Sequence, residues 1–131
     1  MNGQWAECPR ENNQGRWARF YVAMNPKGDI KLSRFTMEML DCPEAFLLLY
    51  DHVNHRIGLK PARLSTKNAY PASPRGPRGG KVIRANRLFD QFGITLTTNM
   101  RFTRPEIDED GILLLDLRKA IPAPRRQAVV R

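Results

Sequence analysis

The sequence predicts a small domain built mainly from β-strands with a few short helices. Apolar and polar residues alternate with a period of two over residues 16–24, and the alternation resumes at Ile30 and Leu32, as in strands with one face on a core. Short apolar runs of strand length occupy 45–50 and 112–117, with turn-forming residues between them. The 131 residues suffice for one compact domain or for two half-size units that share a core.

The first expected element is a hairpin. In the strand over 16–24 the even-numbered residues face the core, and the segment 25–28 (Asn-Pro-Lys-Gly) supplies the turn, because proline fixes one φ and glycine can take a positive one. Ile30 and Leu32 continue the alternation in the second strand. Residues 1–15 are polar and aperiodic, so we expect them to form a mobile arm.

A short helix and two further strands are expected next. Ser33 is suited to be the N-cap, since its hydroxyl can accept a hydrogen bond from a backbone N–H of the first turn, and Pro43 stops the helix. The apolar run 45–50 predicts a strand that is buried on both faces. A turn then leads into a strand over 56–60, which Pro61 ends.

The second half begins with a break in the pattern. Residues 63–79 are rich in proline and glycine and have no periodicity, which predicts a linker or a long exposed loop. We then expect a strand at 82–83 and a short helix that is capped by Asn86 and ended by Gly93. The remaining expected elements are a strand over 99–103, a turn at 108–111 and a strand over 112–117.

Both halves follow the same expected order: glycine turn, strand, short helix, strand, acidic turn, strand. Aligning Gly28 with Gly80 produces this match, and after a gap Leu59 falls on Leu117, so the chain is either an internal duplication or a coincidence of β-rich segments. The expected divisions are an N-terminal arm (1–15), a first β-hairpin module (16–62), a basic linker (63–79), a second β-hairpin module (80–120) and a basic C-terminal tail (121–131).

Positive charge is concentrated in the middle of the chain. The sequence has 22 Lys and Arg against 13 Asp and Glu, a formal charge of +9, and no acidic residue lies between Asp51 and Asp90. This segregation favours a polyanionic partner, because each cation placed near a phosphate releases counterions, although a solvated basic loop is the alternative. The candidate nucleic-acid-binding residues are Arg63, Lys67, Arg75, Arg78, Lys81, Arg84 and Arg87.

The sequence contains no pattern that predicts a catalytic or metal site. Asp51, His52 and His55 could supply metal ligands from one turn, yet no further ligand is indicated, and we expect exposed turn residues. Cys8 and Cys42 lie far apart without zinc-like spacing. We therefore expect a non-catalytic protein without cofactor, metal or small-molecule substrate.

Neither export nor membrane insertion is indicated. The first residues lack the basic and apolar regions of a signal peptide, and no apolar run approaches the length needed to span a membrane. We expect a cytoplasmic protein with reduced thiols.

Residues 19–62, and 27–61 most clearly, resemble the swapped-hairpin module of the AbrB/MazE/MraZ-type transcription regulators and antitoxins. In that family a Lys-Gly or Gly-Arg turn leads into a strand with two alternating aliphatic residues, a short helix and two strands, the last commonly closing on Lys-Pro. The matching residues are Lys27, Gly28, Ile30, Leu32, Leu40, the strand 45–50 and the segment 57–61 (Ile-Gly-Leu-Lys-Pro). Asp29 stands where the family often has arginine. Two such modules in one chain resemble the MraZ arrangement.

The resemblance implies a β-barrel of interlocking hairpins, either as a homodimer or as a pseudo-dimer of two tandem modules. By analogy it implies a DNA-binding transcriptional regulator with duplex DNA as the partner. Two alternatives remain open: a protein-interaction module, antitoxin-like or a scaffold, whose basic loop docks on an acidic partner, and a protein that binds RNA.

Overall fold

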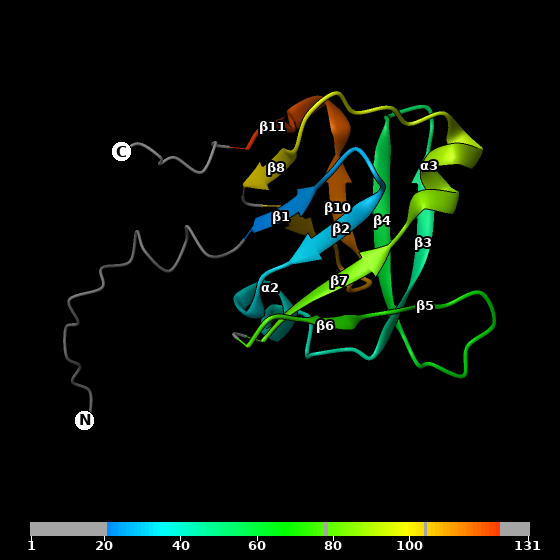
Figure 1. The fold of residues 1–131 in the computed structure, drawn as a ribbon. Helices are drawn as coiled ribbons and strands as arrows, with labels where there is room; N and C mark the ends of the chain where they lie inside the picture. The colour runs from blue at the N-terminus through cyan, green and yellow to red at the C-terminus, as the bar shows by residue number, and fades with distance from the viewer. Residues whose placement is uncertain (1–20, 78, 104, 124–131) are drawn as a thin grey trace, which may run out of the picture.

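The computed structural model describes residues 21–77, 79–103 and 105–123, and it consists mainly of strands in two antiparallel sheets (Figure 1). The predicted β-rich fold with short helices is confirmed. The expected arm over 1–15, the beginning of the first strand and most of the expected tail lie outside the described residues. Within the described part of the chain, no helix is both long and apolar enough to cross a membrane.

The first sheet, called sheet A, has the strand order β11-β8-β1-β2-β7-β6, and all of its neighbouring strands are antiparallel. Its strands are β1 (Tyr21–Met24), β2 (Asp29–Leu32), β6 (Ser73–Arg75), β7 (Gly80–Arg84), β8 (Met100–Thr103) and β11 (Ile121–Pro122). The β1–β2 hairpin follows the expected register, with Val22 opposite Leu32 and Met24 opposite Ile30.

The second sheet, called sheet B, has the antiparallel order β5-β3-β4-β10-β9. Its strands are β3 (Ala45–Asp51), β4 (Arg56–Ala62), β5 (Tyr70–Pro71), β9 (Glu106–Ile107) and β10 (Leu113–Asp116). The helices are α2 (Arg34–Met39), α3 (Asn86–Phe92) and the 3-10 turn η1 (Leu117–Lys119). Leu117, expected in the last strand, instead begins η1.

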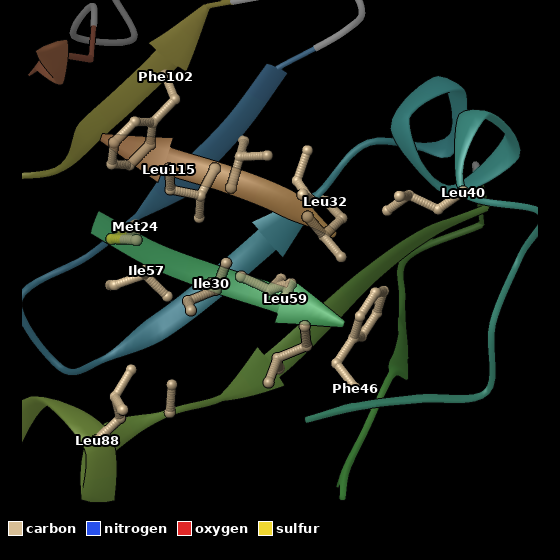
Figure 2. Close-up of a cluster of buried hydrophobic side chains, with 14 of the residues drawn as sticks. Met24, Ile30, Leu32, Leu40, Phe46, Ile57, Leu59, Leu88, Phe102 and Leu115 are labelled. Carbon is tan, nitrogen blue, oxygen red and sulfur yellow. The ribbon is translucent and has the colours of Figure 1, made fainter. Parts of the chain in front are cut away.

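One hydrophobic core lies between the two sheets and joins both halves of the chain (Figure 2). Alternate residues of the central strands point into it, as the period of two requires. Its members include Val22, Met24, Ile30, Leu32, Met37, Phe46, Ile57, Leu59, Ile83, Leu88, Phe89, Phe102, Leu113 and Leu115. The two expected modules therefore bury their apolar faces against each other.

The β1–β2 turn and the start of α2 form as predicted. Asn25 Oδ1 accepts hydrogen bonds from the backbone N–H groups of Lys27 and Asp29, both at 3.0 Å, and Gly28 has a φ of 95°. Ser33 Oγ accepts a hydrogen bond from Thr36 N at 3.2 Å. This bond satisfies an N–H group that the first helical turn leaves without an intrahelical partner.

α3 differs from expectation at its start and agrees at its end. Ala85 is the N-cap and Asn86 is the first helical residue, so the prediction that Asn86 caps the helix is wrong. Ala85 is buried, and its N–H donates to the carbonyl oxygen of Gly28 at 2.8 Å, which fixes the helix start against the β1–β2 turn. Gly93 ends the helix in the left-handed region, with a φ of 65°.

Two short strands lie within the interval 63–79, where we expect a linker or exposed loop. β5 pairs with β3, and β6 pairs with β7. Pro71 and Pro74 conceal these strands in the sequence, yet both strands are at the edges of their sheets, where a residue without an N–H group is tolerated.

Two expectations for β3 and β4 are also wrong. Pro61 does not end β4, because it still pairs with Phe46 of β3. On the other side of β4, the pairing with β10 extends only as far as Leu59. Pro61 therefore has a partner strand on one side alone, where a residue without an N–H group is tolerated. The run 45–50 is not buried on both faces, since Leu49 is 43% exposed. Its register beside Gly58 places Leu49 on the face of sheet B that points away from the core.

The order of elements repeats along the chain. β2, α2, β3, a turn and β4 are followed later by β7, α3, β8, β9, a turn and β10, so the second half has β8 as an additional strand. β2 pairs antiparallel with β7, and β4 pairs antiparallel with β10, which is the arrangement an internal two-fold axis produces. The helix N-caps Ser33 and Ala85 are separated by the same number of residues as Gly28 and Gly80.

The second part of the expected alignment does not hold. Leu59 lies in the middle of β4, whereas Leu117 has already left β10 and begins η1.

Candidate nucleic-acid interface

The predicted basic residues are distributed over several surfaces. Arg63 and Lys67 are exposed in the loop between β4 and β5, and Arg87 is exposed in the first turn of α3. Arg78 lies outside the described residues. Arg63 and Lys67 thus belong to a loop next to sheet B, whereas Arg87 belongs to the helix that follows β7.

The side chain of Lys81 lies on the side of sheet A opposite to that of Val82, the next residue in β7. It pairs with Leu32, whose side chain faces the core, and it lines a groove of about 610 Å³ beside α2 together with Met37 and Cys42. Lys81 therefore lies on the opposite side of sheet A from Lys31 and Arg84.

The outer face of sheet A can be read from the strand register, because side chains at paired positions lie on the same side of a sheet. Val22 and Met24 are buried in the core, so Ala23 between them points outward. Ala23 pairs with Arg101 on one side and with Lys31 on the other. At a strand spacing of about 4.8 Å, the backbones of these two cations are roughly 10 Å apart.

Two predicted cations lie on this same face. Lys31 pairs with Val82, so Arg84, two residues along β7, also points outward. Gly80 lies two residues before Val82 in β7 and is therefore on the same side of the sheet, and Arg75 of β6 pairs with it. A Cβ at Gly80 would lie 3.7 Å from the Arg75 Nη1 atom. The guanidinium of Arg75 thus extends over the glycine.

We call this surface the basic face and define it by Lys31, Arg75, Arg84 and Arg101. Among the described strand positions that point the same way, Asp29 is the only carboxylate. The concentration of charge along the sequence points to Arg75 and Arg84 but not to Lys31 and Arg101, whose charges are interleaved with core residues. The period of two in β2, with Ile30 and Leu32 buried, was the signal that could have placed Lys31 outward.

Asp29 is neutralised within the basic face. Its Oδ1 forms an ion pair with Arg84 Nη1 at 3.4 Å, and its Oδ2 accepts a hydrogen bond from Asn25 Nδ2 at 3.1 Å. The Asp29 side chain is 17% exposed and the Arg84 side chain 69%. A phosphate approaching this face would therefore meet the guanidinium before the carboxylate, despite the departure from the family pattern at position 29.

Asp51 closes the β3–β4 turn through hydrogen bonds with its neighbours. Its carboxylate accepts hydrogen bonds from Asn54 Nδ2 at 2.9 Å and from Arg56 Nη2 at 2.9 Å, and these bonds hold the pKa of Asp51 below its ordinary value. His52 and His55 are exposed in the same turn. Within the residues the structure describes, no group of three or more His, Cys, Asp or Glu side chains could hold a metal ion.

The acidic turn before β10 is explained by backbone hydrogen bonding. Asp108 Oδ1 accepts from the N–H groups of Asp110 and Ile112, both at 2.9 Å, while Gly111 takes a φ of 80°. At the other end of β10, a hydrogen bond from Arg118 lowers the pKa of Asp116.

Comparisons with protein-family models, with curated proteins and with solved structures found no match for this chain.

Proposed function

We propose that this protein is a non-catalytic, cytoplasmic DNA-binding transcriptional regulator of AbrB/MraZ-like type, which contacts the phosphates of duplex DNA through the basic face. The observation that carries this proposal is the grouping of Lys31, Arg75 and Arg84 on one sheet face, where the one described carboxylate is bound to Arg84. Arginine and lysine at such positions supply the sequence-independent part of DNA affinity by releasing counterions.

A swapped-hairpin barrel is the finer architecture that we propose. β5 and β6 are separated by Ala72 alone and lie in different sheets, and β8 and β9 likewise belong to different sheets although they are close in sequence. Two segments that cross between the sheets, together with the antiparallel pairing of β2 with β7 and of β4 with β10, support two interlocked modules within one chain.

A salt titration of DNA binding tests the proposal. Binding of a labelled duplex of mixed sequence is measured by fluorescence anisotropy from 50 to 300 mM salt, for the wild type and for a triple variant of the basic face, Lys31→Ala, Arg75→Ala and Arg84→Ala. Each lost phosphate contact reduces the slope of log K against log salt by about 0.9, so the triple variant loses up to about 2.7 from the slope. A matched variant removes three cations elsewhere, Lys60→Ala, Arg118→Ala and Lys119→Ala, and keeps most of the affinity.

The possible results distinguish whether the protein binds DNA at all from whether it does so through the basic face. If the wild type binds no duplex at low salt, the proposed function is wrong. If both triple variants lose the same affinity, only net charge matters and the basic face is not the site. Single-stranded DNA and RNA of equal length are measured in parallel, and a clear preference for either would replace duplex DNA as the partner.

A further inference from the structure

One ion pair on the basic face joins two strands that are far apart in the sequence. Arg84, at the end of β7, pairs in register with Asp29, at the start of β2, and its Nη1 donates to Asp29 Oδ1 at 3.4 Å across a separation of 55 residues. The other ion pairs among the described residues connect side chains that are at most 5 residues apart. The pair of Asp29 and Arg84 is therefore a product of the fold and not of the local sequence.

The carboxylate of Asp29 is fixed by the β1–β2 turn. Asn25 Nδ2 donates to Asp29 Oδ2 at 3.1 Å, and the backbone N–H of Asp29 donates to Asn25 Oδ1 at 3.0 Å. The backbone N–H of Asn25 in turn donates to the Asp29 carbonyl oxygen at 3.2 Å. These bonds leave Asp29 Oδ1 in a fixed position facing Arg84.

The backbone of Arg84 is held in place on both sides. It pairs with Asp29, and the N–H of the next residue, Ala85, donates to the carbonyl oxygen of Gly28 at 2.8 Å. The Arg84 side chain is nevertheless 69% exposed. The guanidinium is thus preorganised for an external partner, because the ion pair already restricts its rotamers before that partner arrives.

The chemistry of this pair favours recognition of a base edge over a phosphate. An exposed ion pair contributes little to stability, and a carboxylate weakens the attraction of the face for phosphates. A fixed guanidinium is useful where the direction of its N–H groups matters, as in bidentate donation to the O6 and N7 atoms of guanine. Nε and Nη2 of Arg84, which are adjacent donors, take no part in the ion pair.

Arg84 also lies in the part of the face that can enter a groove of DNA. The end of β7 lies beside the β1–β2 turn and the start of α3 (Figure 1), and Pro26 and Lys27 of this turn are exposed. Two strands about 4.8 Å apart fit a major groove about 12 Å wide, whereas the 6 strands of sheet A together do not. Lys31 and Arg75 belong to rows of paired residues that are farther from the turn, where they can remain at the phosphates.

Building on the proposed binding of duplex DNA, on which this inference rests, we propose that Arg84 reads a guanine in the major groove and that Asp29 is its positioning residue. Lys31 and Arg75 contact phosphates and do not discriminate between bases. The protein therefore prefers duplexes in which a guanine presents its O6 and N7 atoms to Arg84.

Replacing guanine by 7-deazaguanine tests this assignment, because the analogue lacks the N7 acceptor but keeps the base pairing and the phosphates. Fluorescence anisotropy measures binding of the mixed-sequence duplex and of its 7-deazaguanine version. The wild type is expected to bind the unmodified duplex at least about fivefold more tightly. Arg84→Lys keeps the charge but loses the planar pair of donors, so the two affinities should become equal while the salt slope is unchanged.

Two further variants separate positioning from charge. Asp29→Asn removes a negative charge from the face, so it should raise the affinity for the 7-deazaguanine duplex and reduce the preference for guanine to less than about twofold. Lys31→Ala is the matched control on the same face. It should weaken binding of both duplexes equally, lower the salt slope by about 0.9 and leave the preference for guanine unchanged.

Circular dichroism first establishes that each variant folds. Equal binding of the two duplexes by the wild type, or a preference that survives Arg84→Lys, would overturn the role of Arg84 and leave the proposed DNA binding standing. A preference that survives Asp29→Asn would overturn the positioning role of Asp29. A wild type that binds neither duplex would instead refute the proposed function. If Asp29→Asn does not fold, Asn25→Ala removes a hydrogen bond to the same carboxylate and should also reduce the preference.

Discussion

The close approach of the β1–β2 turn to α3 gives a quantitative prediction for Gly28→Ala. Gly28 has a φ of 95°, and a Cβ at this position would lie 2.7 Å from Asn86 Cα and 2.9 Å from Asn86 N. Ordinary contacts begin at about 3.4 Å, so the backbone of the helix start must move by roughly 0.7 Å. We expect about 1–2 kcal/mol for the positive φ and about 1–3 kcal/mol for the displaced backbone, a total loss of about 2–5 kcal/mol.

Gly93→Ala provides the matched control. Gly93 also has a positive φ, 65°, but nothing lies within 4 Å of its added Cβ, so the conformational cost stands alone at about 1–2 kcal/mol. Urea denaturation of both variants at 25 °C gives the two free energies of unfolding. A difference of less than about 0.5 kcal/mol between them would refute the reasoning that the two halves meet tightly at Gly28 and Asn86.

Three further predictions concern the cap, the core and the response to acid. Ser33→Ala removes the hydrogen bond to Thr36 N and should lower the free energy of unfolding by about 1 kcal/mol, and an unchanged urea midpoint would contradict the cap assignment. Phe46→Ala deletes a fully buried aromatic side chain and should cost about 3–5 kcal/mol, so a loss below about 1 kcal/mol would place Phe46 outside the core. The pKa of Asp51 is lowered by hydrogen bonds from Asn54 and Arg56, so its stabilising contribution is present above the ordinary aspartate pKa of 3.8 and lost as the pH falls below it. Asp51→Asn should therefore show a smaller decrease in Tm between pH 7 and pH 2.5 than the wild type, and equal decreases would show that this carboxylate does not contribute.

The local patterns in the sequence predict most of the elements because each depends on neighbouring residues. The alternation around Val22 and Ile30, the hydroxyl of Ser33 and the left-handed Gly93 all act within a few residues, and the structure confirms each of them. Asn86 misleads because a buried Ala85, held by the carbonyl of Gly28, occupies the cap position instead. That contact joins residues far apart in the chain, and no local pattern reports it.

The basic face is harder to predict for the same reason. A concentration of charge along the chain identifies Arg75 and Arg84, but the strands then distribute consecutive cations to opposite sides, as Lys81 shows. The period of two in β2 could have placed Lys31 on the outer face, whereas Arg101 joins the face through the pairing of β8 with β1, which no local pattern reports. The exposure of Leu49 is equally a property of the assembled sheet, because an apolar run alone does not reveal which of its faces is covered.

The most direct test of the account is a map of backbone amide chemical shifts on addition of an unlabelled DNA duplex. Binding through the basic face predicts the largest changes at Ala23, Lys31, Val82 and Arg84, and little change across β3, β4 and β10. Shifts that concentrate on Leu49 and its neighbours in sheet B, or a spectrum that DNA leaves unchanged, would contradict it.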